Sequence, residues 1–261
     1  MGAGVVFVRT DLGGDNHVRV SPEAVTQTRL CTVITNASGV SVATIEHLMA
    51  ALAALNIDNV VVELDGTEVP IMDGSALPFV QLLDRAGRRR QDAERRYIEV
   101  LDTVEVWDGD KFARLSPANG FEMAFEIVFP NALIGRQRVE LEIDEDSFRQ
   151  ELADCRTFGF LHEVEALRAA GLARGGSMDN ALVIEGDRLL NPGGLRRPDE
   201  FVRHKALDAV GDLYVLGAPI IGRFEGFKAG HALNNLVVRA LVEQPQAWRF
   251  APFSARLAQA S

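Results

Sequence analysis

The sequence contains little cysteine, no long apolar run and fewer basic than acidic residues. The two cysteines, Cys31 and Cys155, lie far apart and outside any CxxC pair, so neither a disulfide framework nor a thiolate zinc site is indicated. Carboxylates interrupt the apolar segment 206–221, and no stretch approaches the ~20 uninterrupted apolar residues of a membrane-spanning helix. The N-terminus lacks the cationic start of a secretory signal. We therefore expect a soluble, cytoplasmic protein without stable membrane insertion.

The charge balance argues against a nucleic-acid partner. With 27 Lys and Arg against 37 Asp and Glu, the formal net charge is −10, so the overall field repels a polyanion. A local basic pocket for a small phosphorylated substrate is compatible with this charge, because net charge does not describe one cleft.

Apolar patterning predicts an α+β protein. Val- and Ile-rich runs predict strands at 4–9, 29–34, 59–64, 97–106 and 121–129. Helical spacing predicts helices at 44–55, 78–85, 147–154, 162–170 and 200–216. Thr44 is the expected N-cap of the first helix.

A charged stretch, RAGRRRQDAERR at 85–96, separates two parts that each have their own strands and helices. We interpret it as a linker between domains 1–90 and 96–252. The alternative is a solvated helix end within one domain.

Histidine and carboxylate pairs provide the candidate metal ligands. His204 and Asp208 are four residues apart on a predicted helix, so their side chains share one face and could chelate one ion. Taken alone, such a pair also occurs as a hydrogen-bonded surface pair. His47 follows Glu46 at a helix start, which can equally be an ordinary solvated first turn. Two histidines and one carboxylate match a catalytic zinc site, with the fourth position left to water and Glu46 as the base.

His231 is the third candidate. It follows a Gly-rich, aromatic-containing segment, 222–230, that we expect to be a loop, where a histidine could protonate a leaving group. A loop histidine can equally have no special role. We assign none to His17 or His162.

These constellations together resemble the UDP-3-O-acyl-N-acetylglucosamine deacetylase (LpxC) family, the zinc amidases of lipid A biosynthesis. The matching segments are TIEHLMAAL at 44–52, MDGSA at 72–76, RTFGF at 156–160, RHKALDAVGDLY at 203–214 and GHALNN at 230–235. The resemblance implies two similar domains, each with a sheet packed on helices and a small insert, and an active site at their interface. It also implies a UDP-linked acylated amino sugar as substrate. We expect a monomer.

The resemblance also assigns roles to single residues. It implies Zn²⁺ bound by His47, His204 and Asp208, with Glu46 as general base and His231 as catalytic acid or electrostatic stabiliser. The remaining implied roles are oxyanion support by the Thr157 hydroxyl, orientation of His231 by Asp212 and proximity of Lys205 to the substrate phosphates.

The inserts follow from the same resemblance. One, at about 158–184, would form a hydrophobic passage for the fatty acyl chain, and a small inserted sheet is expected near 30–44. Candidate passage residues are Phe158, Phe160, Leu161, Val164, Gly176, Ser177, Met178, Ala181 and Val183.

The sequence departs from the family at its N-terminus, where we expect an extra strand and a Gly-Leu-His turn that are not found. We interpret this as a late start assignment or a shortened chain. One alternative is therefore an inactive homologue that binds a nucleotide sugar or an acyl chain without turnover. Another is a zinc hydrolase of the same fold that acts on a different N-acyl amino sugar.

Overall fold

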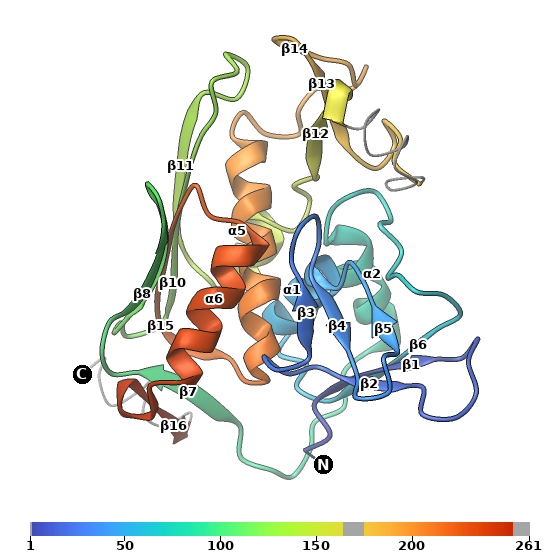
Figure 1. Cartoon of the computed structure of the whole chain (residues 1–261), viewed down its shortest axis with the longest axis vertical. Helices are drawn as coiled ribbons and strands as arrows, with labels where there is room; N and C mark the ends of the chain where they lie inside the picture. The colour runs from blue at the N-terminus through green and yellow to red at the C-terminus, as the bar shows by residue number, and fades with distance from the viewer. Residues whose placement is uncertain (1, 164–174, 253–261) are drawn as a thin grey trace.

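The computed structural model describes residues 2–163 and 175–252 and has the predicted α+β class (Figure 1). The first part of the chain forms β1 (Val5–Arg9), β2 (His17–Arg19), β3 (Val25–Gln27), β4 (Val33–Thr35), β5 (Ser41–Val42), α1 (Glu46–Ala54), β6 (Val60–Leu64) and α2 (Leu77–Ala86).

The second part begins with a set of strands that build most of the largest sheet. These strands are β7 (Arg96–Val100), β8 (Val104–Asp108), β9 (Lys111–Ser116), β10 (Phe121–Val128) and β11 (Arg136–Glu142), and the helix α3 (Glu145–Glu151) follows them. The rest are β12 (Phe158–Phe160), β13 (Leu182–Glu185), β14 (Arg188–Leu189), α5 (Glu200–Leu213), η1 (Tyr214–Leu216), β15 (Ile220–Phe227), α6 (His231–Val242), η2 (Pro245–Ala247) and β16 (Trp248–Pro252).

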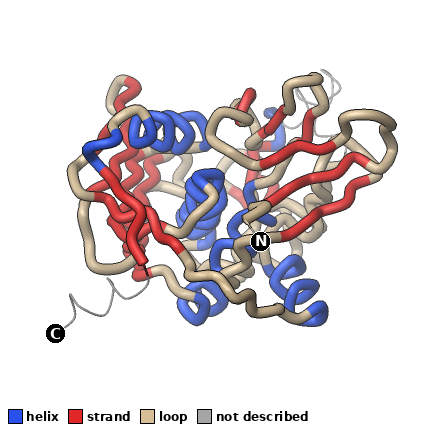
Figure 2. The backbone as a smooth tube through the Cα atoms, turned by 90° about the horizontal axis from the view of Figure 1, so that it is seen from below, coloured by secondary structure: helices blue, strands red, loops and turns tan. Residues whose placement is uncertain are grey.

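Helices lie between sheets contributed by the two parts of the chain (Figures 1 and 2). On one side is a three-stranded sheet of order β2-β1-β6, and on the other a seven-stranded sheet whose main path is β11-β10-β15-β7-β16. Two more three-stranded sheets, β3-β4-β5 and β12-β13-β14, are set apart from these. The first agrees with the small sheet expected near 30–44, and the second begins the segment expected as an insert at 158–184.

The helical layer depends on α1 and α5, which pack against each other. Eight of the nine α1 residues are buried, as expected for a helix that is apolar on all sides. α5 also packs on α6 and on β10 and β11, so it lies between the two parts of the chain. Leu48, Leu52 and Leu55, which recur at helical spacing in the predicted helix 44–55, are all buried.

Several local predictions are wrong. Thr44 does not cap α1, because its φ is 58° and its hydroxyl donates to Glu68 Oε1, so Ile45 is the N-cap residue. The predicted strand 97–106 is two strands, β7 and β8. Of the predicted strand 29–34, only the last two residues belong to a strand, β4. The helix predicted at 147–154 begins earlier, because Asp144 and Ser147 form a capping box. The helix predicted at 162–170 lies mostly outside the described residues.

The segment 222–230 is not a loop. Most of it belongs to β15, which pairs with β10 and β7 in parallel and with β9 antiparallel. Gly222 and Gly226 lie inside this strand because side chains of Val100 and Phe125 occupy the space that a Cβ would need. His231 therefore begins a helix, α6, instead of lying in a turn.

The charged stretch joins α2 to β7 and is mostly exposed. Its arginines make ion pairs with both parts of the chain, Arg95 with Asp58 and Arg88 with Glu145. One cluster of buried apolar side chains includes residues from both parts. The division into two domains therefore stays a prediction. Within the described residues, no helix is long and apolar enough to cross a membrane.

Candidate metal centre and active site

A close crossing of α1 and α5 brings the candidate ligands together. A Cβ on Gly211 would lie 2.0 Å from the backbone oxygen of Glu46 and 3.0 Å from the backbone nitrogen of Ala50. Only glycine therefore permits this separation of the two helices. As a result, the first turn of α1, with Glu46 and His47, lies beside the turn of α5 that carries Asp208 and Asp212.

The three predicted metal ligands form one buried cluster. The ligand atoms of His47, His204 and Asp208 all lie within 4.8 Å of one another. Asp208 Oδ1 is 3.4 Å from His47 Nε2 and 3.3 Å from His204 Nε2. None of the three side chains is more than 4% exposed, so the ordinary solvated helix turn considered for His47 does not apply.

The hydrogen bonds around this cluster use His204 Nδ1 and Asp208 Oδ2, so the atoms of the two side chains that face each other, His204 Nε2 and Asp208 Oδ1, could bind a cation. His204 Nδ1 lies 3.0 Å from the backbone carbonyl of Cys155, which fixes the tautomer with a free Nε2. Asp208 Oδ2 accepts from Lys205 Nζ at 2.6 Å. Asp208 Oδ1 is buried and has no hydrogen-bond donor among the described residues. A buried carboxylate oxygen without a partner is costly, so the three residues fit a metal ion.

Electrostatics favour the ligating form of His204. Burial lowers its pKa to about 3, so the ring is neutral at physiological pH. Neutral imidazole is the form that binds a metal.

Glu46 lies beside the cluster of candidate ligands and is 3% exposed. Its Oε2 accepts from the backbone N–H of Thr32 at 3.0 Å, while no donor from the described part of the chain binds Oε1. Burial raises the pKa of this carboxyl above its usual value. A raised pKa suits a group that takes up and returns a proton near neutral pH.

His231 and Asp212 form a hydrogen-bonded pair on the other side of the cluster. His231 Nδ1 is 2.8 Å from Asp212 Oδ2, and its Nε2 lies 3.9 Å from Asp208 Oδ2. Burial acts to lower the pKa of His231, but the Asp212 carboxylate raises it to about 9. The imidazole is therefore protonated at neutral pH, and its Nε2 can donate.

Thr157 is placed by the turn that contains MDGSA. Its backbone N–H donates to the carbonyl of Gly74 at 2.8 Å, and a Cβ on Gly74 would lie 2.1 Å from the carbonyl oxygen of Asn180. With a φ of 84°, Gly74 is also in the left-handed region. This turn therefore ties the first part of the chain to the segment around β12 and β13.

Three candidate passage residues, Phe158, Phe160 and Val183, belong to the small β12-β13-β14 sheet. The ring of Phe158 lies 6.4 Å from that of His204 and 5.0 Å from that of Phe201, so β12 begins next to the cluster of candidate ligands. Phe158 pairs with Leu182 and Phe160 with Ile184, which places Val183 on the opposite face of the sheet from both phenylalanines.

The other candidates differ in their exposure. Ser177 and Met178 are exposed, whereas Leu161, Gly176 and Ala181 are partly buried. Val164 lies outside the described residues.

The sequence did not identify several contacts of this centre. They are the Gly211 crossing, the Cys155 carbonyl on His204, the two hydrogen bonds of Thr32, and the donation from Asn234 Nδ2 to Asp212 Oδ2. None has a signal in the local sequence pattern, because each joins residues that are distant along the chain or uses a backbone atom.

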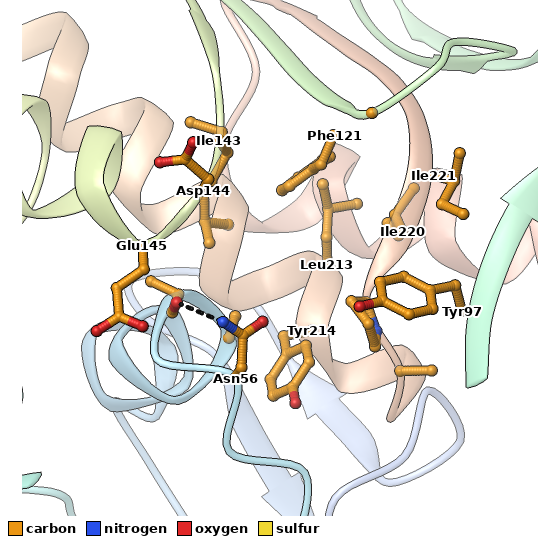
Figure 3. A pocket seen from close by; sticks show the side chains of 16 residues that line it. Asn56, Tyr97, Phe121, Ile143, Asp144, Glu145, Leu213, Tyr214, Ile220 and Ile221 are labelled. Atoms are coloured by element: carbon orange, nitrogen blue, oxygen red, sulfur yellow. Dashed lines mark hydrogen bonds between the residues drawn. The ribbon is translucent and has the colours of Figure 1, made fainter. Parts of the chain in front are cut away.

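A cavity of about 110 Å³ lies near the other end of the α1–α5 pair (Figure 3). Its lining includes Asn56, Tyr97, Leu213 and Tyr214 and contains none of the candidate ligands or catalytic residues. The cluster of candidate ligands and this cavity are therefore separate features.

Comparisons with known proteins identify the family of this chain. Residues 1–243 match the model of the family described as UDP-3-O-acyl N-acetylglycosamine deacetylase, LpxC. A UDP-3-O-acyl-N-acetylglucosamine deacetylase of Phenylobacterium zucineum is 69% identical over 258 residues, 98% of this chain and 88% of that protein. Proteins of the same name from Chromobacterium violaceum and a Shewanella species are each 50% identical over 252 residues, 96% of this chain and 83% and 82% of theirs. This chain belongs to the LpxC family of deacetylases.

Proposed function

We propose that this chain hydrolyses the acetamide of UDP-3-O-acyl-N-acetylglucosamine to release acetate and UDP-3-O-acyl-glucosamine, with Zn²⁺ as its metal. The observation that carries the proposal is the buried cluster of His47, His204 and Asp208, next to Glu46 and His231, in which one Asp208 oxygen has no hydrogen-bond donor from residues 2–163 and 175–252. The names of the relatives supply the substrate.

His47, His204 and Asp208 would hold the metal through two ring nitrogens and one carboxylate oxygen. A bound zinc ion would polarise the amide carbonyl and make water more acidic. The Cys155 carbonyl orients the His204 ring, and Lys205 holds the second Asp208 oxygen. A role for Lys205 at the substrate phosphates would require its ammonium to turn away from Asp208.

Glu46 would accept the proton of the attacking water on Oε1, because Oε2 is bound by Thr32. The carbon–oxygen bond would form as this proton leaves, and the cationic His231 ring would stabilise the resulting oxyanion, with the Thr157 hydroxyl as a further proposed donor.

His231 would then complete the cleavage. Its Nδ1–H is held by Asp212, so the Nε2 proton is the one that faces the reacting groups. Transfer of that proton, or of the one held by Glu46, to the sugar nitrogen lets the carbon–nitrogen bond break. Acetate and the free amine are the products.

The segment beginning with Phe158 is the proposed site of the acyl chain. It starts beside His204, so an acyl chain bound along it would leave the sugar at the metal. The site draws His47 from the first part of the chain and His204 from the second, which supports the proposed domains 1–90 and 96–252.

The test is to purify the chain, measure its zinc content and assay acetate release from the acylated UDP-sugar. We expect zinc in the wild type and its loss, with activity, in His204→Ala. His17→Ala is the matched control, because His17 is exposed on β2 and far from the cluster in sequence and sheet. Wild-type protein without zinc, or a fully active His204→Ala, would contradict the proposal.

Two comparisons separate the alternatives. Zinc binding without acetate release would favour the homologue that binds without turnover, whereas the assembled base and acid favour turnover. Equal hydrolysis of UDP-N-acetylglucosamine that lacks the acyl chain would favour a hydrolase for another amino sugar.

A further inference from the structure

Thr32 links the small β3-β4-β5 sheet to the active site. It directly precedes β4 and is 2% exposed. Its hydroxyl donates to Asp212 Oδ1 at 2.6 Å, across 180 positions of the sequence. This bond joins the first part of the chain to α5.

The backbone of Thr32 contacts α1 at the same place. Its N–H donates to Glu46 Oε2 at 3.0 Å, and its carbonyl accepts from the backbone N–H of Ile45, which precedes α1. One residue therefore binds the carboxylate of the proposed base and the carboxylate that holds the proposed acid.

The hydroxyl of Thr32 is one of three groups that donate hydrogen bonds to the Asp212 carboxylate. Oδ2 accepts from His231 Nδ1 and Asn234 Nδ2, while Oδ1 accepts from Thr32. Asp212 is 2% exposed, so bulk water is not available to replace a lost donor on Oδ1. Without the Thr32 hydroxyl, the carboxylate would rotate to find another donor, and the direction of its bond to His231 would change.

We propose that Thr32 is a positioning residue that fixes Asp212, and through it the His231 ring, relative to Glu46. This role rests on the proposed function. It would also give the small β3-β4-β5 sheet a role in catalysis. Thr32 directly precedes β4, so this sheet positions it where it can hydrogen-bond the carboxylates of Glu46 and Asp212.

The test compares substitutions that keep or remove one hydroxyl. Thr32→Val keeps the branched shape and removes the donor, whereas Thr32→Ser keeps the donor. Thr35→Val is the matched control on the same sheet, because the Thr35 hydroxyl bonds to Thr26 in an exposed position. We expect Thr32→Val to lower kcat by about 10- to 100-fold, the range for groups that orient catalytic ligands, with KM and zinc content unchanged.

The serine and control variants should stay close to wild type. The role is overturned if Thr32→Val retains kcat, or if Thr32→Ser is as impaired as Thr32→Val, which would assign the effect to a general disturbance of packing at this position. Where the valine variant does not fold, Thr32→Ala removes the same hydroxyl without a branched side chain, and full activity in that variant also overturns the role.

A double-mutant comparison tests whether Thr32 acts through Asp212. In an Asp212→Ala background, Thr32→Val should change kcat by less than about twofold, because the carboxylate through which Thr32 would act is no longer present. An undiminished effect of Thr32→Val there would contradict the proposed route.

A spectroscopic measurement separates this role from the proposed function. The Nδ1–H resonance of His231, assigned by its loss in His231→Gln, reports the bond to Asp212 without turnover. We expect it in wild type and Thr32→Ser, and shifted or lost in Thr32→Val. If the wild type releases no acetate, the proposed function fails, while an unchanged resonance in Thr32→Val overturns the positioning role independently.

Discussion

The close packing of α1 against α5 at Gly211 leads to a quantitative prediction about both stability and metal binding. In Gly211→Ala the new Cβ would lie 2.0 Å from the Glu46 carbonyl oxygen, whereas nonbonded heavy atoms rest roughly 3.5 Å apart. The obstacle is backbone, so no side-chain rotation relieves it, and α1 and α5 must separate by about 1 Å or more.

The magnitude follows from two opposing contributions. Alanine in a helix interior is more favourable than glycine by about 1 kcal/mol, whereas overpacking costs about 1–3 kcal/mol. Because the clash is with backbone, we take the upper end and expect a net loss of about 2 kcal/mol, or a Tm lower by about 4–8 °C. A displacement of about 1 Å in the catalytic groups can reduce turnover by about 100-fold, so zinc content and kcat should both fall.

The assay is urea denaturation together with zinc analysis and the acetate assay. Gly193→Ala is the control, because a Cβ added at Gly193 would meet no atom within 4 Å and the φ of this residue is not in the left-handed region. Wild-type stability and full zinc content in Gly211→Ala would refute the conclusion that this glycine sets the helix separation.

Three further predictions follow from the site and its surroundings. Glu46→Gln should keep zinc but lower kcat by about 100- to 10,000-fold in the acetate assay, and loss of zinc would place Glu46 among the ligands. The pKa of His231 is raised from 6.5 to about 9, so its charged form stabilises the fold fully below 6.5 and this contribution is lost as pH rises through about 9. We therefore expect kcat/KM to decline through that range, and a decline that persists in His231→Gln would refute the assignment. Glu200 is 0% exposed and binds Arg156, so Glu200→Ala should lower the free energy of unfolding by about 3–5 kcal/mol in denaturant, whereas the exposed Glu185→Ala should have no measurable effect.

The sequence by itself determined the α+β class and the candidate metal ligands. Spacing of four residues puts His204 and Asp208 on one helical face whatever the tertiary structure, and apolar periodicity predicted the helices α1 and α5. These properties are local, because they depend on the geometry of one helix. Local residue types suggested His47 as a third ligand but left an ordinary helix turn as an equal alternative, and the resemblance to the family favoured the site and added His231 to it.

Only the tertiary structure decided how these groups meet. The Gly211 contact, the Cys155 carbonyl on His204 and the bond from Thr32 to Asp212 join distant segments through backbone atoms or single hydroxyls. Such contacts leave no periodic pattern in the sequence. The same reason explains the wrong prediction for 222–230, where glycines allow close packing of neighbouring side chains inside β15 and do not mark a turn. Close approach of chain segments is a property of the packed molecule, so it has to be read from the structure.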